Sequence, residues 1–342
     1  MRSAREWGLI PDGKPGAGNG ITDVPGVRVG HFDLRGPGLM TGVTAVLPHA
    51  GDLFRLRPRA AVEIVNGFGK SAGLMQVAEL GMIETPILLT NTFGVAACTE
   101  ALIRRAVAAN PRIGRDWPTV NPLVCECNDG QINDLHALAI TPDHAGAALA
   151  AAAEGPVRQG SVGAGSGMTA FGFKAGIGTA SRRLDIGGQH VLGALVLANF
   201  GSAGDLVLPD GRRPLPARPA EAERGSVIVV LATDLPLADR QLQRVARRGA
   251  AGLARLGAFW GHGSGDVVLC FTTADPARFP AEEPFSTQRR LADDHIDLAF
   301  RAAAEATHEA VLNALCFAEP ARGRDGRPFP ALTDWLRENP HP

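Results

Sequence analysis

The dipeptide Gly225-Ser226 lies where a polar loop rich in Pro and Arg becomes the apolar run at 227–232. A serine that follows glycine at the start of a strand can attack the preceding carbonyl, shift the acyl group from nitrogen to oxygen and be released by water. The new N-terminal amine, whose pKa is about 7.7 to 8.0, can then act as the base for its own hydroxyl. This pattern predicts that Ser226 is a nucleophile, although Gly-Ser also ends many ordinary loops.

Two further polar residues are expected at the same edge of the sheet as this serine. Apolar runs at 227–232 and 266–271 predict strands, and the segment 237–256 between them predicts a helix. A strand, a crossover helix and a second strand normally return parallel, so both strands begin at one edge. Ser264 and Asp266, two residues apart in an extended segment, should point to one face and reach the nucleophile. Both residues are also common turn formers.

An oxyanion donor is the remaining requirement. Asn199 ends the apolar run 191–199 and is the best candidate, because a carboxamide N–H can stabilise a developing negative charge. A conventional Ser-His-Asp triad is disfavoured, since the segments 163–167 and 261–265 both depart from the nucleophile-elbow pattern G-x-S-x-G. A serine that uses its own amine needs no histidine.

The elements that position these residues alternate between strands and helices, which indicates an α/β fold. Strands are predicted within 21–47, broken at Gly36-Pro37-Gly38, and at 60–66, 85–90 and 122–127, with helices at 97–109 and 294–317. After the strand at 60–66, Ser71 is expected to cap a helix that runs to about Leu80.

Composition narrows the function further. With 342 residues and a formal net charge of −1, the chain carries no electrostatic footprint for nucleic acid or a membrane surface. Its five cysteines are odd in number and indicate a reducing, cytoplasmic compartment. Cys125 and Cys127 lack a second pair at zinc-ligand spacing, and the glycine-rich segment 160–181 lacks a phosphate-loop register. We therefore expect a small, nearly neutral substrate and neither metal nor cofactor.

Taken in order, these segments resemble the DmpA-like L-aminopeptidase/D-esterases and β-aminopeptidases over nearly the whole chain. The motifs that carry the resemblance are GITDVPGVRVGH at 20–31, GPV at 155–157, VGAGSGM at 162–168, KAGIGTAS at 174–181, ANFG at 198–201, GSVIVV at 225–230, GSGD at 263–266, EAT at 305–307 and LNAL at 312–315.

The resemblance implies a four-layer α/β/β/α fold in one domain, similar to N-terminal nucleophile hydrolases but connected differently. It implies self-cleavage into residues 1–225 and 226–342, and an oligomer of these processed heterodimers, with a tetramer suggested. The family roles fall on Ser226 as nucleophile, Asn199 in the oxyanion hole, and Ser264 with Asp266 as positioning partners. Glu126 then resembles the carboxylate that holds the free amino group of the substrate.

The chain departs from the family pattern near that carboxylate. It contains no Tyr, and Asn128 and Gln131 stand in the stretch where members often have one, so we expect these two residues to bind the substrate together with Glu126. Lys70 stands where relatives commonly have an acid. These departures affect the expected substrate more than the catalytic class. The alternatives are an acyltransferase resembling the ornithine acetyltransferases, an oligoamide hydrolase of the nylon-degrading type, and a catalytically impaired binding protein.

Overall fold

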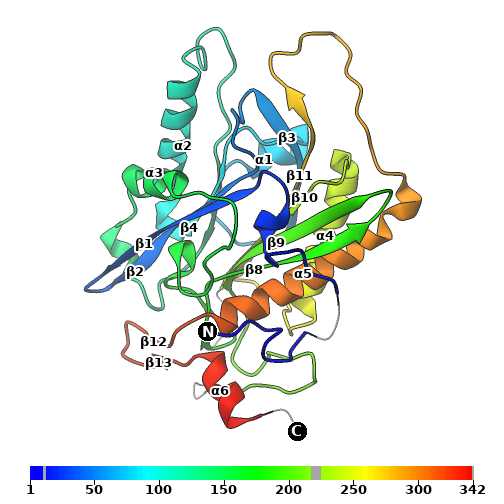
Figure 1. Ribbon diagram of the computed structural model, residues 1–342. Helices are drawn as coiled ribbons and strands as arrows, with labels where there is room; N and C mark the ends of the chain where they lie inside the picture. Colours follow the sequence, from blue (N-terminus) through cyan, green and yellow to red (C-terminus); the bar gives the residue numbers. More distant parts are fainter. Residues whose placement is uncertain (11–12, 217–224, 341–342) are drawn as a thin grey trace.

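Two β-sheets form the centre of the molecule in the computed structural model, which describes residues 1–10, 13–216 and 225–340 (Figure 1). The polar stretch at 202–225, which the sequence predicts to be a surface loop or a processing linker, therefore lies partly outside the described residues. The first sheet has the strand order β1-β2-β4-β5 and comprises β1 (Arg28–Gly36), β2 (Leu39–Leu47), β4 (Ile87–Asn91) and β5 (Leu123–Cys127). The second has the order β3-β11-β10-β9-β8 and comprises β3 (Leu56–Gly67), β8 (Ile177–Asp185), β9 (Gln189–Asn199), β10 (Ser226–Thr233) and β11 (Gly265–Arg278).

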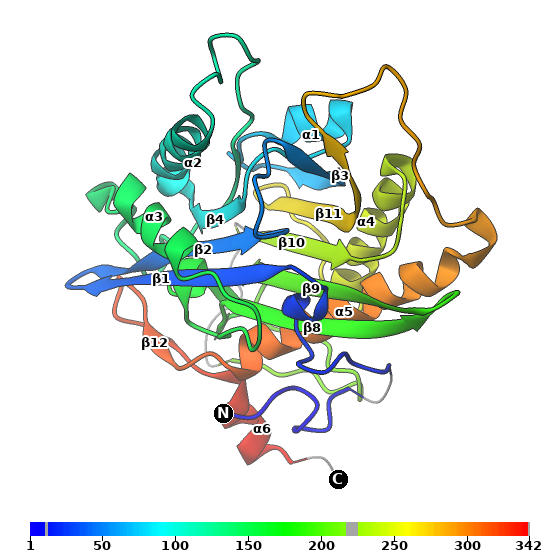
Figure 2. The same ribbon diagram turned by 45° about the horizontal axis from the view of Figure 1, so that its top comes forward.

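Helices cover the outer face of each sheet, which confirms the predicted four-layer α/β/β/α arrangement (Figures 1 and 2). The helices α2 (Val95–Ala109) and α3 (Pro142–Ala150) pack on the first sheet, and α4 (Asp239–Ala254) and α5 (Asp297–Cys316) pack on the second. Side chains such as Ile228 and Leu197 from one sheet and Cys127 from the other form an apolar layer between them. Since the central strands of the second sheet are covered on both faces, they appear in the sequence as continuous apolar runs.

The crossover that was predicted around the nucleophile is present. Strand β10 pairs in parallel with β11, with Ser226 opposite Gly265, and α4 joins the two strands. On its other side β10 pairs antiparallel with β9, so that Ser226 lies opposite Asn199. Three segments that are distant in the sequence therefore meet at one edge of the second sheet.

The helix that was expected to begin at Ser71 begins later. The structure has α1 at Leu74–Leu80, and its N-cap is Gly73 in a left-handed conformation with φ of 88°. The backbone of Gly73 also packs directly against the backbone of Pro122, so a side chain at position 73 would have no room for its Cβ. The prediction was wrong because the cap is determined by this close approach of two chain segments, and Ser71 is left in the loop.

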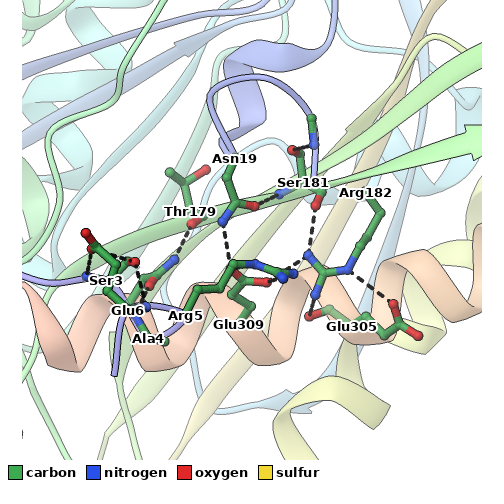
Figure 3. Close-up of polar contacts among 12 residues, drawn as sticks. Ser3, Ala4, Arg5, Glu6, Asn19, Thr179, Ser181, Arg182, Glu305 and Glu309 are labelled. Carbon is green, nitrogen blue, oxygen red and sulfur yellow. Dashed lines mark hydrogen bonds and ion pairs between the residues drawn. The ribbon is translucent and has the colours of Figure 1, made fainter. Parts of the chain in front are cut away.

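The N-terminal segment crosses the outer face of α5 and β8 (Figure 3). Arg5 and Arg182 both bind the buried carboxylate of Glu309, at 2.7 and 2.8 Å. Asn19 adds a third donor to Glu309, and Arg182 also pairs with Glu305. No sequence pattern indicated this network.

Smaller elements complete the chain. They are the helix α6 (Leu332–Glu338), the two-residue strands β6 (Thr169–Ala170), β7 (Phe173–Lys174), β12 (Ala321–Arg322) and β13 (Pro328–Phe329), and the 3-10 helices η1 (Ile21–Asp23), η2 (Thr92–Gly94), η3 (Leu135–Ala137), η4 (Gly163–Gly165) and η5 (Asp293–His295). Of the helices in the described ranges, none has the length and apolar character needed to cross a membrane.

Candidate active site

Ser226 is the first residue of β10 and is almost fully buried, with 4% of its surface exposed. Its hydroxyl donates to the carbonyl oxygen of Gly225 at 2.7 Å. The backbone N–H of Gly265 on the neighbouring strand donates to the hydroxyl oxygen at 3.2 Å. The hydroxyl is therefore held against the peptide bond that the sequence marked for cleavage.

Asn199 faces Ser226 across the β9–β10 pairing, and side chains of residues opposed in this way point to the same side of a sheet. Its Oδ1 accepts from the backbone N–H of Thr169 at 3.1 Å, and its Nδ2 donates to the carbonyl oxygen of Asn128 at 3.0 Å. A carboxamide nitrogen carries two hydrogens, so the carboxamide is oriented by two bonds while one N–H remains to stabilise an oxyanion.

Ser264 and Asp266 form a fully buried pair in which the hydroxyl donates to the carboxylate at 2.7 Å. They share a face, as the spacing predicted, but it is not the face of the Ser226 side chain. Because Ser226 is in register with Gly265, its hydroxyl points between the sheets, and Asp266 points towards the helices with Val268. The pair thus flanks the backbone of Ser226 and not its hydroxyl.

Glu126 lies near the end of β5 with 2% of its surface exposed. One carboxylate oxygen accepts from the backbone N–H of Lys70 at 2.8 Å, and the other accepts from the hydroxyl of Thr92. Such bonds stabilise a carboxylate and aim it at one point. The arrangement is suited to binding a cation.

The loop at 67–70 joins this carboxylate to the nucleophile. A Cβ built on Gly69 would lie 3.7 Å from Gly265 Cα and 3.8 Å from Glu126 Oε1. In turn a Cβ on Gly265 would lie 2.9 Å from Gly69 Cα. A Cβ at Gly69 would make only ordinary contacts, whereas Gly265 requires glycine because the backbone of the loop packs directly on it.

Of the two residues proposed to shape the substrate pocket, the structure brings one to the site. Asn128 contributes its backbone carbonyl to Asn199, and its side chain accepts from the N–H of Gly130 at 2.9 Å and so holds its own turn. Gln131 is exposed, and its carbonyl accepts from the N–H of Arg324 at 2.9 Å. The backbone of Gln131 therefore anchors the C-terminal segment near β12.

Sequence reasoning missed Thr92 as the partner of Glu126. Strands β4 and β5 are parallel neighbours, with Thr90 opposite Glu126, so the residues that follow β4 lie beside the end of β5. A signal for this contact was available in the sequence, since polar residues occur at the ends of both buried runs. The carboxyl ends of neighbouring parallel strands meet at one edge of a sheet, so such residues lie close together.

Lys174 is a second group that the sequence did not single out for a role. It is fully buried, and its ammonium donates to the carbonyls of Met168 at 2.8 Å and Ala175 at 2.6 Å. Burial lowers the pKa of Lys174 to about 7. Met168 precedes Thr169, which holds Asn199, so Lys174 fixes the glycine-rich turn that positions the carboxamide.

Comparison with known proteins identifies the family of the chain. The model of "Peptidase family S58" matches residues 19–329. The chain belongs to peptidase family S58. A β-peptidyl aminopeptidase, BapA of Sphingosinicella microcystinivorans, is 38% identical over 351 residues, which cover 94% of this chain and 87% of that protein.

Two solved structures extend the similarity to the S58 fold. The PH0078 protein from Pyrococcus horikoshii OT3 aligns with a TM-score of 0.92 and 41% identity over 98% of both chains. The L-aminopeptidase D-Ala-esterase/amidase from Ochrobactrum anthropi, described as a variant of the Ntn hydrolase fold, aligns with a TM-score of 0.89 and 35% identity over 99% of both chains. This S58 chain is accordingly a peptidase with aminopeptidase function and an Ntn-hydrolase type of fold.

Proposed function

We propose that the protein is made as a precursor that cleaves itself between Gly225 and Ser226 and then acts as an N-terminal-serine aminopeptidase. The observation that carries this proposal is the Ser226 hydroxyl, held 2.7 Å from the Gly225 carbonyl oxygen and opposite Asn199. In the cleavage step Oγ bonds to the Gly225 carbonyl carbon, the C–N bond breaks, and the hydroxyl proton passes to the nitrogen. Water then hydrolyses the ester and frees the serine.

The mature enzyme uses the released amine of Ser226 as its base. The amine takes the hydroxyl proton while Oγ attacks the substrate carbonyl, and the oxyanion is stabilised by the free N–H of Asn199. The protonated amine then donates to the leaving group, and water hydrolyses the acyl-enzyme by the reverse proton path. Ser264 and Asp266, which flank the Ser226 backbone, orient the amine.

The substrate is a small peptide, amide or ester with a free amino group. Glu126 binds that group as an ammonium ion, because its carboxylate is already oriented by Lys70 and Thr92. The relative named as a β-peptidyl aminopeptidase supports β-amino acid amides as one substrate class.

The test of this function is the mass of the purified protein after incubation at neutral pH. We expect two chains, residues 1–225 and 226–342, with Ser226 as the N-terminus of the smaller one. Aminoacyl p-nitroanilides and β-amino acid amides should be hydrolysed at a rate that rises with the processed fraction. A protein that stays one chain and hydrolyses none of these substrates would refute the proposal.

Substitution Glu126→Gln should weaken substrate capture without preventing cleavage of the precursor. The variant keeps the shape of the side chain but loses the charge that pairs with the ammonium, so kcat/KM should fall about 10- to 100-fold, by analogy with the loss of a charged hydrogen bond. N-acetylated substrates should be poor for both proteins. An equal kcat/KM for Glu126→Gln and wild type would remove Glu126 from the substrate site.

A further inference from the structure

Lys70 is one of only three lysines in a chain that otherwise uses arginine, and it lies beside the proposed amine anchor. Its backbone N–H binds Glu126, while its ammonium lies 4.0 Å from the ring centre of Phe68 and donates to the Phe68 carbonyl at 3.2 Å. Within residues 1–10, 13–216 and 225–340, no ion pair joins this ammonium to a carboxylate. The backbone of Lys70 thus contacts the Glu126 carboxylate, while its exposed ammonium rests on Phe68 of the same loop and is available to bind an anion.

The ammonium is on a loop that is fixed to the nucleophile edge. The N–H of Phe68 donates to the carbonyl of Ser264 at 3.3 Å, and the Asn66 carboxamide donates to the same carbonyl. The Phe68 carbonyl that holds the ammonium lies 3.0 Å from the Cβ position of Gly265, and Gly265 donates to the Ser226 hydroxyl. Short contacts in series therefore lead from Lys70 Nζ to the nucleophile.

We propose that Lys70 is a specificity-determining residue that selects substrates whose amine-bearing residue also carries a free carboxylate. This inference rests on the proposed roles of Glu126 and Ser226. A cationic side chain on the loop whose backbone holds Glu126 can bind a carboxylate of the same small residue whose ammonium Glu126 binds, because each charge then has a partner of opposite sign. A substrate with a cationic side chain is repelled by the same lysine.

Two sources present this chemistry. In an aspartyl residue linked through its α-carboxyl, the carboxylate is on the side chain. In an aspartyl residue linked through its β-carboxyl, the free α-carboxylate is on the same carbon as the amine, and the bond cleaved is that of a β-amino acid. Both linkages place an ammonium and a carboxylate close together on one residue, and the assay below distinguishes the two linkages.

The assay compares matched acidic and neutral substrates. The α-linked pair is the p-nitroanilides of L-aspartate and L-asparagine, and the β-linked pair is β-aspartyl p-nitroanilide and 3-aminobutanoyl p-nitroanilide. We expect wild type to prefer the acidic member of at least one pair, and Lys70→Gln to lower that acidic-to-neutral ratio of kcat/KM about tenfold or more. Lys70→Arg keeps the charge and should keep the preference, as should the distant control Lys14→Gln. Raising the salt concentration from 50 to 500 mM should reduce the wild-type ratio, because salt screens an exposed charge.

A Lys70→Gln variant with the wild-type ratio for both pairs overturns the proposal. Calorimetric titration with L-aspartate and L-asparagine gives a readout that does not need turnover. If the protein hydrolyses no substrate, the proposed peptidase mechanism fails, and a preference for aspartate that Lys70→Gln removes still supports the anion site. If the wild-type protein does not prefer aspartate, or if Lys70→Gln keeps the preference, the proposed role of Lys70 is overturned.

Discussion

Replacing Ser226 with alanine should leave the protein as a single uncleaved chain without measurable aminopeptidase turnover. The substitution removes the atom that contacts the Gly225 carbonyl, so neither the acyl shift nor the later attack on substrate has a nucleophile. Loss of the nucleophile in a serine hydrolase lowers kcat by about 10⁴-fold or more, and here it also prevents release of the amine that serves as base. Intact-mass analysis and a p-nitroanilide assay on the same sample measure both effects.

Two further variants make this result specific. Ser286→Ala removes an exposed hydroxyl in a distant loop and should be processed like wild type. Ser226→Thr retains a hydroxyl and should be cleaved, at a reduced rate because the added methyl group enters a site with only 4% exposure. A cleaved and active Ser226→Ala protein would show that the nucleophile is another residue.

Replacing Glu309 with glutamine should destabilise the protein by about 3–5 kcal/mol, the usual cost of leaving a buried charge without its partner. Glu309 is fully buried between two guanidinium groups, and Arg182 is only 4% exposed (Figure 3). The neutral carboxamide can accept a hydrogen bond but forms no ion pair with Arg5 or Arg182, and Glu305, which is partly exposed, remains as the carboxylate of Arg182. The N-terminal segment should also detach from α5, because Arg5 and Asn19 bind the same carboxylate.

The matched control is Glu100→Gln, which breaks an exposed i,i+4 pair with Arg104. Exposed pairs contribute about 0.5 kcal/mol or less, so this variant should unfold close to wild type. Urea unfolding midpoints measured at one protein concentration and one state of processing compare the variants. Equal midpoints for Glu309→Gln and Glu100→Gln would show that the buried network is not stabilising.

The predicted elements around the nucleophile are close to those observed because their signals are local. The apolar run before Asn199 and the run after Ser226 are both strands, and the segment between Ser226 and Gly265 contains the expected crossover helix. These features depend on the hydrophobic character of residues that are neighbours in the chain, and right-handed crossovers leave few alternatives. The error at Ser71 arose where a distant segment, Pro122, determines the backbone.

Sequence reasoning identified the individual polar residues of the site but not how their side chains are oriented relative to Ser226. Ser264 and Asp266 share a face by strand alternation, and that prediction depends only on their spacing. Which face of Ser226 they meet depends on the register between β10 and β11, which no local pattern specifies. The same limit applies to Thr92, whose contact with Glu126 requires the pairing of β4 with β5.

By itself, the sequence determined the α/β class, the Gly225-Ser226 junction and its motif partners, because these features are encoded in short runs of residue types and in their order. Only the tertiary structure decided that Ser264 and Asp266 flank the backbone of Ser226, and that the backbone of Lys70 binds Glu126 from a loop packed on Gly265. Those relations join residues that are far apart in the chain, and they are set by strand register and by the packing of one backbone on another.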